Sequence, residues 1–306
     1  MGKRELPVGR YSIGTVAQRT GLSVHTLRAW ENRHGLLQPI RSDGGHRLYS
    51  EQDLRVLSRI IDLLGQGHRI GEIARIGRDN LADQDDDARY PPIVGERKSA
   101  YLHRWVHDLV SIACTMNQSR LELALDRAGV RLPSDVIVHQ LIPQVAYDIG
   151  TRWATGECSV AAEHIASAVF SRRMLSILEA EQRYRTSAPA VVCACLPTEL
   201  HSLGLVIHAI GLSQQGLRVH FLGSDVPFSA IGEAMDRLSP KEIHLSVSIH
   251  QTYQEQRSPL LGLVEAARAS GHSVQIGGQG VPNSDQELTA LGCIVHPRRL
   301  GLGSPS

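Results

Sequence analysis

Glu199, His201 and Gly204 stand in the order E-x-H-x-x-G directly after an apolar run. The run 191–196 reads VVCACL and predicts a buried strand, while the amphipathic pattern over 203–215 predicts a helix. The motif therefore falls at the carboxyl end of a strand, where open parallel sheets bind ligands. An imidazole near a carboxylate suits a metal ligand, because the carboxylate sets which ring nitrogen carries the proton. Gly204 would let the backbone approach a bulky group, although the motif alone also fits a solvated loop histidine.

A second group of side chains that could contact a ligand lies earlier in the chain. Nine residues separate Trp153 from the pair Glu163 and His164, and Gly156 between them favours a bend. An indole, a carboxylate and an imidazole brought together in this way could cover a flat ligand that carries a polar group. The spacing by itself is equally typical of ordinary side chains on a helix surface.

The strand before the E-x-H-x-x-G motif is the first of five predicted strands. The others span 218–223, 243–249, 273–278 and 293–296, with helices expected at 228–238, 256–270 and 284–291. Alternating strands and helices predict a doubly wound parallel sheet, and in the order 2-1-3-4-5 the first, third and fourth strands are neighbours. Ser246 and Ser248 fall within the third strand, and Gly277 and Gly278 end the fourth. We therefore expect these four residues at the same edge as His201.

Helical patterns fill the stretch before the sheet. Four predicted helices span 98–115, 118–129, 134–150 and 159–184, with breaks at Asn117, the 129–133 corner and Gly156, and with Ser159 as a candidate N-cap. Short connections between antiparallel helices favour a four-helix bundle. A bundle that serves only for dimerisation, without a ligand, would show the same pattern.

The first eighty residues have the pattern of a winged helix-turn-helix. We expect helices at 11–19, 24–33, 53–64 and 70–76, with Ser23 as the N-cap of the second. Trp30 is interpreted as core, and Glu31 as the partner of a basic neighbour. A Gly-Gly turn flanked by basic and aromatic residues predicts a hairpin wing able to lie along phosphates. The wing residues that we expect near phosphates are Arg41, His46, Arg47 and Tyr49.

Charge separates the two ends of the chain. Residues 1–80 contain 13 Lys plus Arg and 8 Asp plus Glu, a net charge of +5, while the remainder contains 19 and 23, a net charge of −4. A basic amino-terminal module on an acidic body predicts contact with nucleic acid at one end. The acidic, proline-bearing stretch LADQDDDARYPPIVGE is typical of a linker. The expected domains are 1–80, a linker at 81–97, 98–186 and 187–306.

Composition argues against a membrane or secreted protein. The sequence has no long uncharged apolar window and no apolar signal core at its start, so we expect a cytoplasmic protein without a membrane span. Its five cysteines include no C-x-x-C pair. We interpret Cys193 and Cys195 as small core residues of a strand.

The run TLRAWENRHGLLQPIRSDGGHRLYSEQDL resembles the DNA-binding domain of the MerR family of transcriptional regulators. The resemblance covers roughly the first 75 residues, with turn, helix and wing in register. It implies a recognition helix that carries His25, Thr26 and Arg28, and a wing that holds Arg41, His46, Arg47 and Tyr49 near the DNA backbone. It also implies a homo-oligomer, dimer or tetramer, on double-stranded operator DNA.

Residues 199–278 resemble the cobalamin-binding domain that corrinoid methyltransferases, mutases and light-sensing regulators share. Its signature is [DE]-x-H-x-x-G followed by a serine and then a glycine pair; here 41 residues separate Gly204 from Ser246. The resemblance implies that His201 binds cobalt, and that the nucleotide tail enters the sheet beside Ser246, Gly277 and Gly278. Glu199 and Ser248 depart from the usual Asp and Thr or Leu.

The whole chain resembles MerR regulators of the CarH/LitR type, which are photoreceptors that use adenosylcobalamin. By this resemblance Trp153 and Glu163 contact the adenosyl group and His164 lines the same pocket. We therefore predict a light-responsive repressor and not an enzyme, with methylcobalamin as another candidate cofactor. Two alternatives remain: a corrinoid carrier protein for methyl transfer, and a MerR-type regulator that has lost cobalamin and responds to a protein partner.

Overall fold

The computed structural model describes residues 11–42, 44–65, 68–83, 97–183 and 187–297. The chain divides into two compact units, Met1–Val169 and Phe170–Ser306. None of the described helices has the length and apolarity needed to span a membrane.

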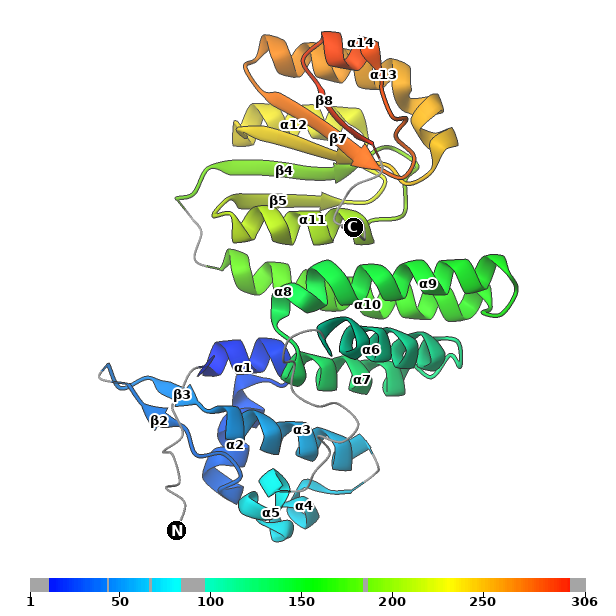
Figure 1. Ribbon diagram of the computed structural model, residues 1–306. Helices are drawn as coiled ribbons and strands as arrows, with labels where there is room; N and C mark the ends of the chain where they lie inside the picture. Colours follow the sequence, from blue (N-terminus) through cyan, green and yellow to red (C-terminus); the bar gives the residue numbers. More distant parts are fainter. Residues whose placement is uncertain (1–10, 43, 66–67, 84–96, 184–186, 298–306) are drawn as a thin grey trace. The chain divides into compact units, whose positions relative to one another are not determined.

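The first unit begins with a winged helix-turn-helix (Figure 1). A small antiparallel sheet in the order β1-β3-β2 consists of Tyr11–Ser12 (β1), Ile40–Arg41 (β2) and Arg47–Tyr49 (β3). The helices are Ile13–Thr20 (α1), Val24–His34 (α2), Glu51–Gly65 (α3), Ile70–Ile76 (α4) and Arg78–Asp83 (α5). The expected helix-turn-helix and hairpin wing are therefore present.

Local capping sets the turn between α1 and α2. Ser23 accepts the N–H of Thr26 and caps α2, which confirms the predicted N-cap. The prediction that the first helix begins at Tyr11 is wrong, because Tyr11 pairs with Tyr49 of β3 and Ser12 then caps α1. Trp30 is 7% exposed and belongs to the module's apolar core, as expected.

The bundle helices follow the predicted positions closely. They are Arg97–Ala113 (α6), Gln118–Arg131 (α7), Ser134–Val136 (α8), Ile142–Ala154 (α9) and Val160–Gln182 (α10), and a π-helical turn at Ile137–Leu141 joins α8 to α9. Sequence periodicity did not indicate the π-helical turn, because it inserts a wider turn into a helix that otherwise continues. The predicted corner at 129–133 begins too early, since α7 runs on to Arg131.

The second unit contains a five-stranded parallel sheet in the order β5-β4-β6-β7-β8. Its elements are Ala190–Cys195 (β4), Leu203–Gln214 (α11), Arg218–Gly223 (β5), Phe228–Leu238 (α12), Glu242–Ser246 (β6), His250–Ala269 (α13), Ser273–Gly278 (β7), Gln286–Ala290 (α14) and Ile294–Pro297 (β8). In chain order the sheet reads 2-1-3-4-5, which confirms the predicted doubly wound fold.

Helices cover both faces of this sheet. Figure 1 shows α12 and α13 on one side and α11 on the other, and the first two share an apolar core with residues of β4, β6 and β7. Cys193 and Cys195 are fully buried in β4, and burial raises the pKa of Cys195 to about 12. Both are therefore unreactive core thiols, as predicted.

Candidate functional site

The loop between β4 and α11 holds Glu199 and His201 in direct contact. Glu199 is fully buried, whereas the His201 side chain is 63% exposed. Oε1 of Glu199 lies 2.7 Å from Nδ1 of the His201 ring and accepts the His201 backbone N–H at 2.8 Å. The turn is tight, since Thr198 has a φ of 65°. A buried carboxylate thus anchors an exposed imidazole at the carboxyl edge of the sheet.

Glu199 also joins this loop to its neighbours. Its Oε2 accepts the backbone N–H groups of Ser248 at 2.6 Å and Ile249 at 3.1 Å, and its carbonyl accepts that of Asp225 at 2.9 Å. Burial alone would raise the pKa of Glu199, but the His201 ring and the three N–H donors outweigh it and lower the pKa to about 2. The carboxylate is therefore ionised at neutral pH.

The ionised carboxylate fixes the tautomer of His201. Because a carboxylate only accepts hydrogen bonds, Nδ1 carries the ring hydrogen and the lone pair lies on Nε2. Metal-binding histidines have this arrangement, with one ring nitrogen held by a carboxylate and the other presented to the metal. The geometry therefore suits His201 for the predicted role of a cobalt ligand, which stays a prediction.

The other residues expected at this edge have different environments. Ser246 is the last residue of β6, is 1% exposed and lies opposite Gly277 in the parallel register. The prediction that Ser248 lies within the strand is wrong, because β6 ends at Ser246 and the backbone N–H of Ser248 donates to the buried Glu199 carboxylate. Gly278 has a φ of 122°, and a Cβ there would lie 2.1 Å from the Val247 carbonyl oxygen. Only glycine fits at this close approach of two backbones.

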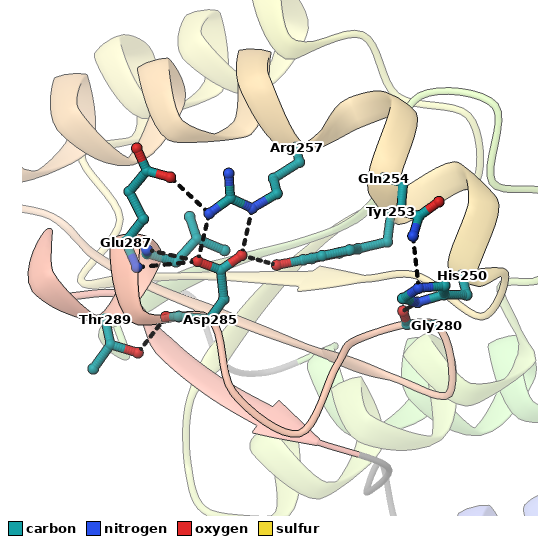
Figure 2. A network of polar contacts seen from close by, with 9 residues as sticks. His250, Tyr253, Gln254, Arg257, Gly280, Asp285, Glu287 and Thr289 are labelled. Carbon is teal, nitrogen blue, oxygen red and sulfur yellow. Dashed lines mark hydrogen bonds and ion pairs between the residues drawn. The ribbon is translucent and has the colours of Figure 1, made fainter.

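Figure 2 shows a polar network around Asp285, Tyr253 and Arg257 that the sequence did not indicate. Asp285 caps α14, accepts the Tyr253 hydroxyl at 2.6 Å and binds the Arg257 guanidinium at 2.6 and 2.8 Å. The hydrogen bond from Arg257 is the main reason that the pKa of Asp285 lies far below its usual value. Nδ1 of His250 lies 2.9 Å from the carbonyl oxygen of Gly280. These contacts tie α13 to the segment that follows β7.

A cavity of about 420 Å³ lies between α11 and the sheet and reaches Gly277. Its wall includes His208 of α11 and His244 of β6, whose Nε2 and Nδ1 atoms are 3.0 Å apart. Burial lowers the pKa of both rings, and that of His208 falls to about 4, so both are neutral at pH 7. At the start of α11, a Cβ added to Gly204 would meet no described atom within 4 Å. The second unit therefore has a cavity beside Gly277, one of the predicted residues, with room for part of a ligand.

The residues predicted to cover a ligand lie in the first unit. Trp153, in the last turn of α9, is 51% exposed, and Glu163 and His164 lie near the start of α10. Oε2 of Glu163 is 2.5 Å from Nδ1 of His164, and its Oε1 accepts the Ser167 hydroxyl at 2.5 Å. Gly156 has a φ of 78°, which confirms the bend. The contact of these side chains with a common ligand stays a prediction.

The predicted DNA contacts fall into two groups. His25, Arg28, Arg41 and His46 are exposed, while Thr26 is partly buried and its N–H and hydroxyl bond to the N-cap Ser23.

Two wing residues have structural partners instead. Tyr49 is fully buried and its hydroxyl donates to Glu31. The expectation that this side chain lies near the DNA backbone is therefore wrong. Nε of Arg47 lies 2.9 Å from both carboxylate oxygens of Glu31. This confirms the expected basic partner of Glu31, and it makes Arg41 the better candidate for a phosphate contact.

Comparison with known proteins supports the DNA-binding module and also finds relatives that span most of the chain. A model described as "MerR HTH family regulatory protein" matches residues 11–79. The HTH-type transcriptional repressor CarH of Myxococcus xanthus is 30% identical over 274 residues, which are 88% of this chain and 88% of that protein. The chain belongs to the CarH-type branch of the MerR family. The HTH-type transcriptional repressor CarA of the same organism is 27% identical and covers 92% of this chain and 90% of its own length.

Membership of this branch confirms the predicted transcriptional regulator. Both relatives carry the name of a repressor and not of an enzyme. Among solved structures, the monomethylamine corrinoid protein of Methanosarcina barkeri has a TM-score of 0.51 and 15% identity, covering 65% of this chain and 94% of that chain. That likeness concerns the fold alone.

Proposed function

We propose that the chain is a cobalamin-dependent transcriptional repressor, released from its operator by light. The observation that carries the proposal is the Glu199–His201 pair, in which a buried, ionised carboxylate leaves the His201 lone pair on Nε2. Cobalamin would bring a cobalt ion that can take a nitrogen ligand from the protein, and His201, with its tautomer fixed by Glu199, would supply that nitrogen. His201 is the metal ligand that we assign.

The other residues at the sheet edge fit the nucleotide tail of the same cofactor. The cavity beside Gly277 is roughly 420 Å³, within the range of small-molecule sites, and its wall is partly apolar and partly hydrogen-bonding. We propose that the tail lies there beside Gly277 and extends toward Ser246 and Gly278 at the ends of β6 and β7. Ser248 contributes its backbone N–H to Glu199 and so orients His201 indirectly.

We propose that the response to light depends on an adenosyl group carried by the cofactor. Adenosylcobalamin, when bound, supplies a cobalt–carbon bond that light breaks. Trp153 offers an exposed indole and Glu163 a carboxylate that could hold the adenosyl group, with His164 beside them. Loss of the adenosyl group would remove its contacts with these residues. A ligand shifts a conformational equilibrium only when its contacts differ between the two states, so these contacts would have to favour the dark form. We propose a homo-oligomer on a two-fold operator in the dark and a smaller, weakly binding form in the light.

The test uses the full chain reconstituted with adenosylcobalamin. His201→Ala should retain its circular dichroism spectrum but bind the cofactor weakly or in the base-on form, as the visible spectrum reports. A matched control is His107→Ala, because His107 is also exposed and lies beside a carboxylate, that of Asp108. Full-strength binding with an unaltered spectrum in His201→Ala would contradict the ligand assignment.

The light switch has a separate test. Light scattering and operator binding should be measured on the same sample before and after green light. Equal mass and equal affinity in both states would leave a cobalamin-binding regulator without a light switch.

A further inference from the structure

Within the first unit, the C-terminal turn of α7 is capped by a side chain from the DNA-binding module. Nε of Arg19, in the last turn of α1, donates to the Gly129 carbonyl at 2.9 Å, and Nη2 donates to the carbonyls of Val130 at 2.9 Å and Leu132 at 3.5 Å. The last carbonyls of a helix have no partner within the helix, and a cation there is favoured by the helix dipole. Arg19, a residue of the DNA-binding module, therefore caps the C-terminal end of the bundle helix α7.

Gly129 brings the two backbones into contact. A Cβ built on Gly129 would lie 1.5 Å from the carbonyl oxygen of Arg19 and 2.7 Å from its carbonyl carbon. Gly129 lies inside α7 and has no positive φ, so helix geometry alone would favour alanine by about 1 kcal/mol. The close approach of α1 is the physical reason for glycine at this position.

Apolar and polar contacts extend the same joint. Val130 is 4% exposed and belongs to one apolar cluster with Val16 of α1 and Leu27 of the recognition helix α2. Nε of Arg131 lies 3.3 Å from the buried Ser58 hydroxyl on α3. One side of α7 is thus part of the core on which the DNA-reading helix rests.

We infer that α7 and the winged helix-turn-helix form one rigid unit, and that this joint sets the affinity of the assembled protein for its two-fold operator. A rigid joint holds two DNA-reading helices of an oligomer at a fixed spacing, so the second half-site binds without a further ordering cost. A loosened joint leaves each module able to read its half-site but removes that preorganisation. The inference rests on the proposed oligomer, and not on cobalamin.

Gly129→Ala separates this role from stability of the bundle, because alanine favours the helix while its Cβ forces α1 away from α7. The matched control is Gly262→Ala in α13, where a Cβ meets no described atom within 4 Å. Two duplexes serve as probes: one carries a two-fold site selected in vitro with this protein, and the other has one half scrambled. Amide hydrogen exchange of the DNA-free protein reports the joint directly.

We expect Gly129→Ala to exchange faster in α1 and the end of α7, to lose about tenfold or more in affinity for the two-fold site, and to bind the single half-site as the wild type does. Arg19→Gln should shift both readouts in the same direction, by less. Unchanged exchange protection, or equal losses on both duplexes, would overturn the inference. Failure of the proposed function is distinct: cobalamin or light would then not alter wild-type binding, while the exchange result stands.

Discussion

Replacing Glu199 by Gln separates the two tasks of this carboxylate. Glu199 accepts two hydrogen bonds on each oxygen, from the ring and backbone of His201 and from the N–H groups of Ser248 and Ile249. Glutamine has the same shape but only one accepting oxygen, so two of the four donors would face an NH₂ group. If the amide oxygen keeps the hydrogen bonds from Ser248 and Ile249, the NH₂ group faces His201. Nδ1 of the ring must then lose its hydrogen in order to accept a hydrogen bond from the NH₂ group. The hydrogen then moves to Nε2, and the lone pair needed by cobalt is lost.

The loss of stability follows from the same count. A hydrogen bond to a charged group contributes about 1.5–3 kcal/mol, so two lost bonds, one of them recovered by the new tautomer, destabilise by about 2–4 kcal/mol. That change corresponds to a fall in Tm on the order of 10 °C. The assay is a titration with adenosylcobalamin followed by visible absorption, beside a thermal melt. We expect Glu199→Gln to lose the histidine-ligated spectrum although His201 is intact.

Asp285→Asn is the matched control for this prediction. Asp285 is a buried carboxylate of the same unit with a comparable set of donors, but its partners Tyr253 and Arg257 do not touch His201. Its replacement should lower Tm similarly and leave the cobalt ligand in place. A histidine-ligated spectrum of normal strength in Glu199→Gln would refute the tautomer argument, whatever the melt shows.

Four further outcomes are expected. Arg41→Ala should weaken binding to all DNA sequences alike and reduce the salt slope by about one, as a lost phosphate contact does, whereas Arg47→Ala should mainly lower Tm, because it leaves the carboxylate of Glu31 without its guanidinium. Burial, and then the neighbouring His244 and His296, lowers the pKa of His208 to about 4. As the pH falls, this histidine is protonated in the unfolded chain before it is protonated in the folded protein, so its effect on stability is constant above pH 7 and lowers the free energy of unfolding by up to ~3 kcal/mol between pH 6.5 and 4. His208→Leu should flatten this part of a curve of Tm against pH. Trp153→Ala should reduce the difference in mass between dark and light samples in light scattering while the cofactor spectrum persists.

Local patterns were sufficient to predict the fold and the contact between Glu199 and His201 in the candidate site. The doubly wound parallel sheet follows from alternating strands and helices, although alternation alone does not give the strand order. Glu199 and His201 stand where a strand ends, so their contact needs only a tight turn. The contacts that were missed join residues far apart in the chain. Asp285 meets Arg257 across 28 residues, and although a basic partner of Glu31 is expected, that this partner is Arg47, 16 residues away, depends on side-chain directions that periodicity does not encode.

Gly129 shows the limit most directly. A glycine shortly before Pro133 is typical of a helix end, and the sequence alone favours a corner that begins at Gly129. Its actual neighbour is the backbone of Arg19, 110 residues away, so nothing in the local pattern could indicate the contact.

The same reasoning explains why Glu199 is more than a partner of His201. An aspartate is usual at this position in the cobalamin-binding enzymes that the domain resembles, and its side chain is one methylene shorter. With the backbone held as it is here, its carboxylate would lie farther from the imidazole, from the Ser248 N–H, or from both. The longer side chain of Glu199 reaches both, since its two oxygens bond to opposite loops. The imidazole is therefore oriented by the same carboxylate that binds the backbone after β6, so a change in either loop should alter the orientation of His201.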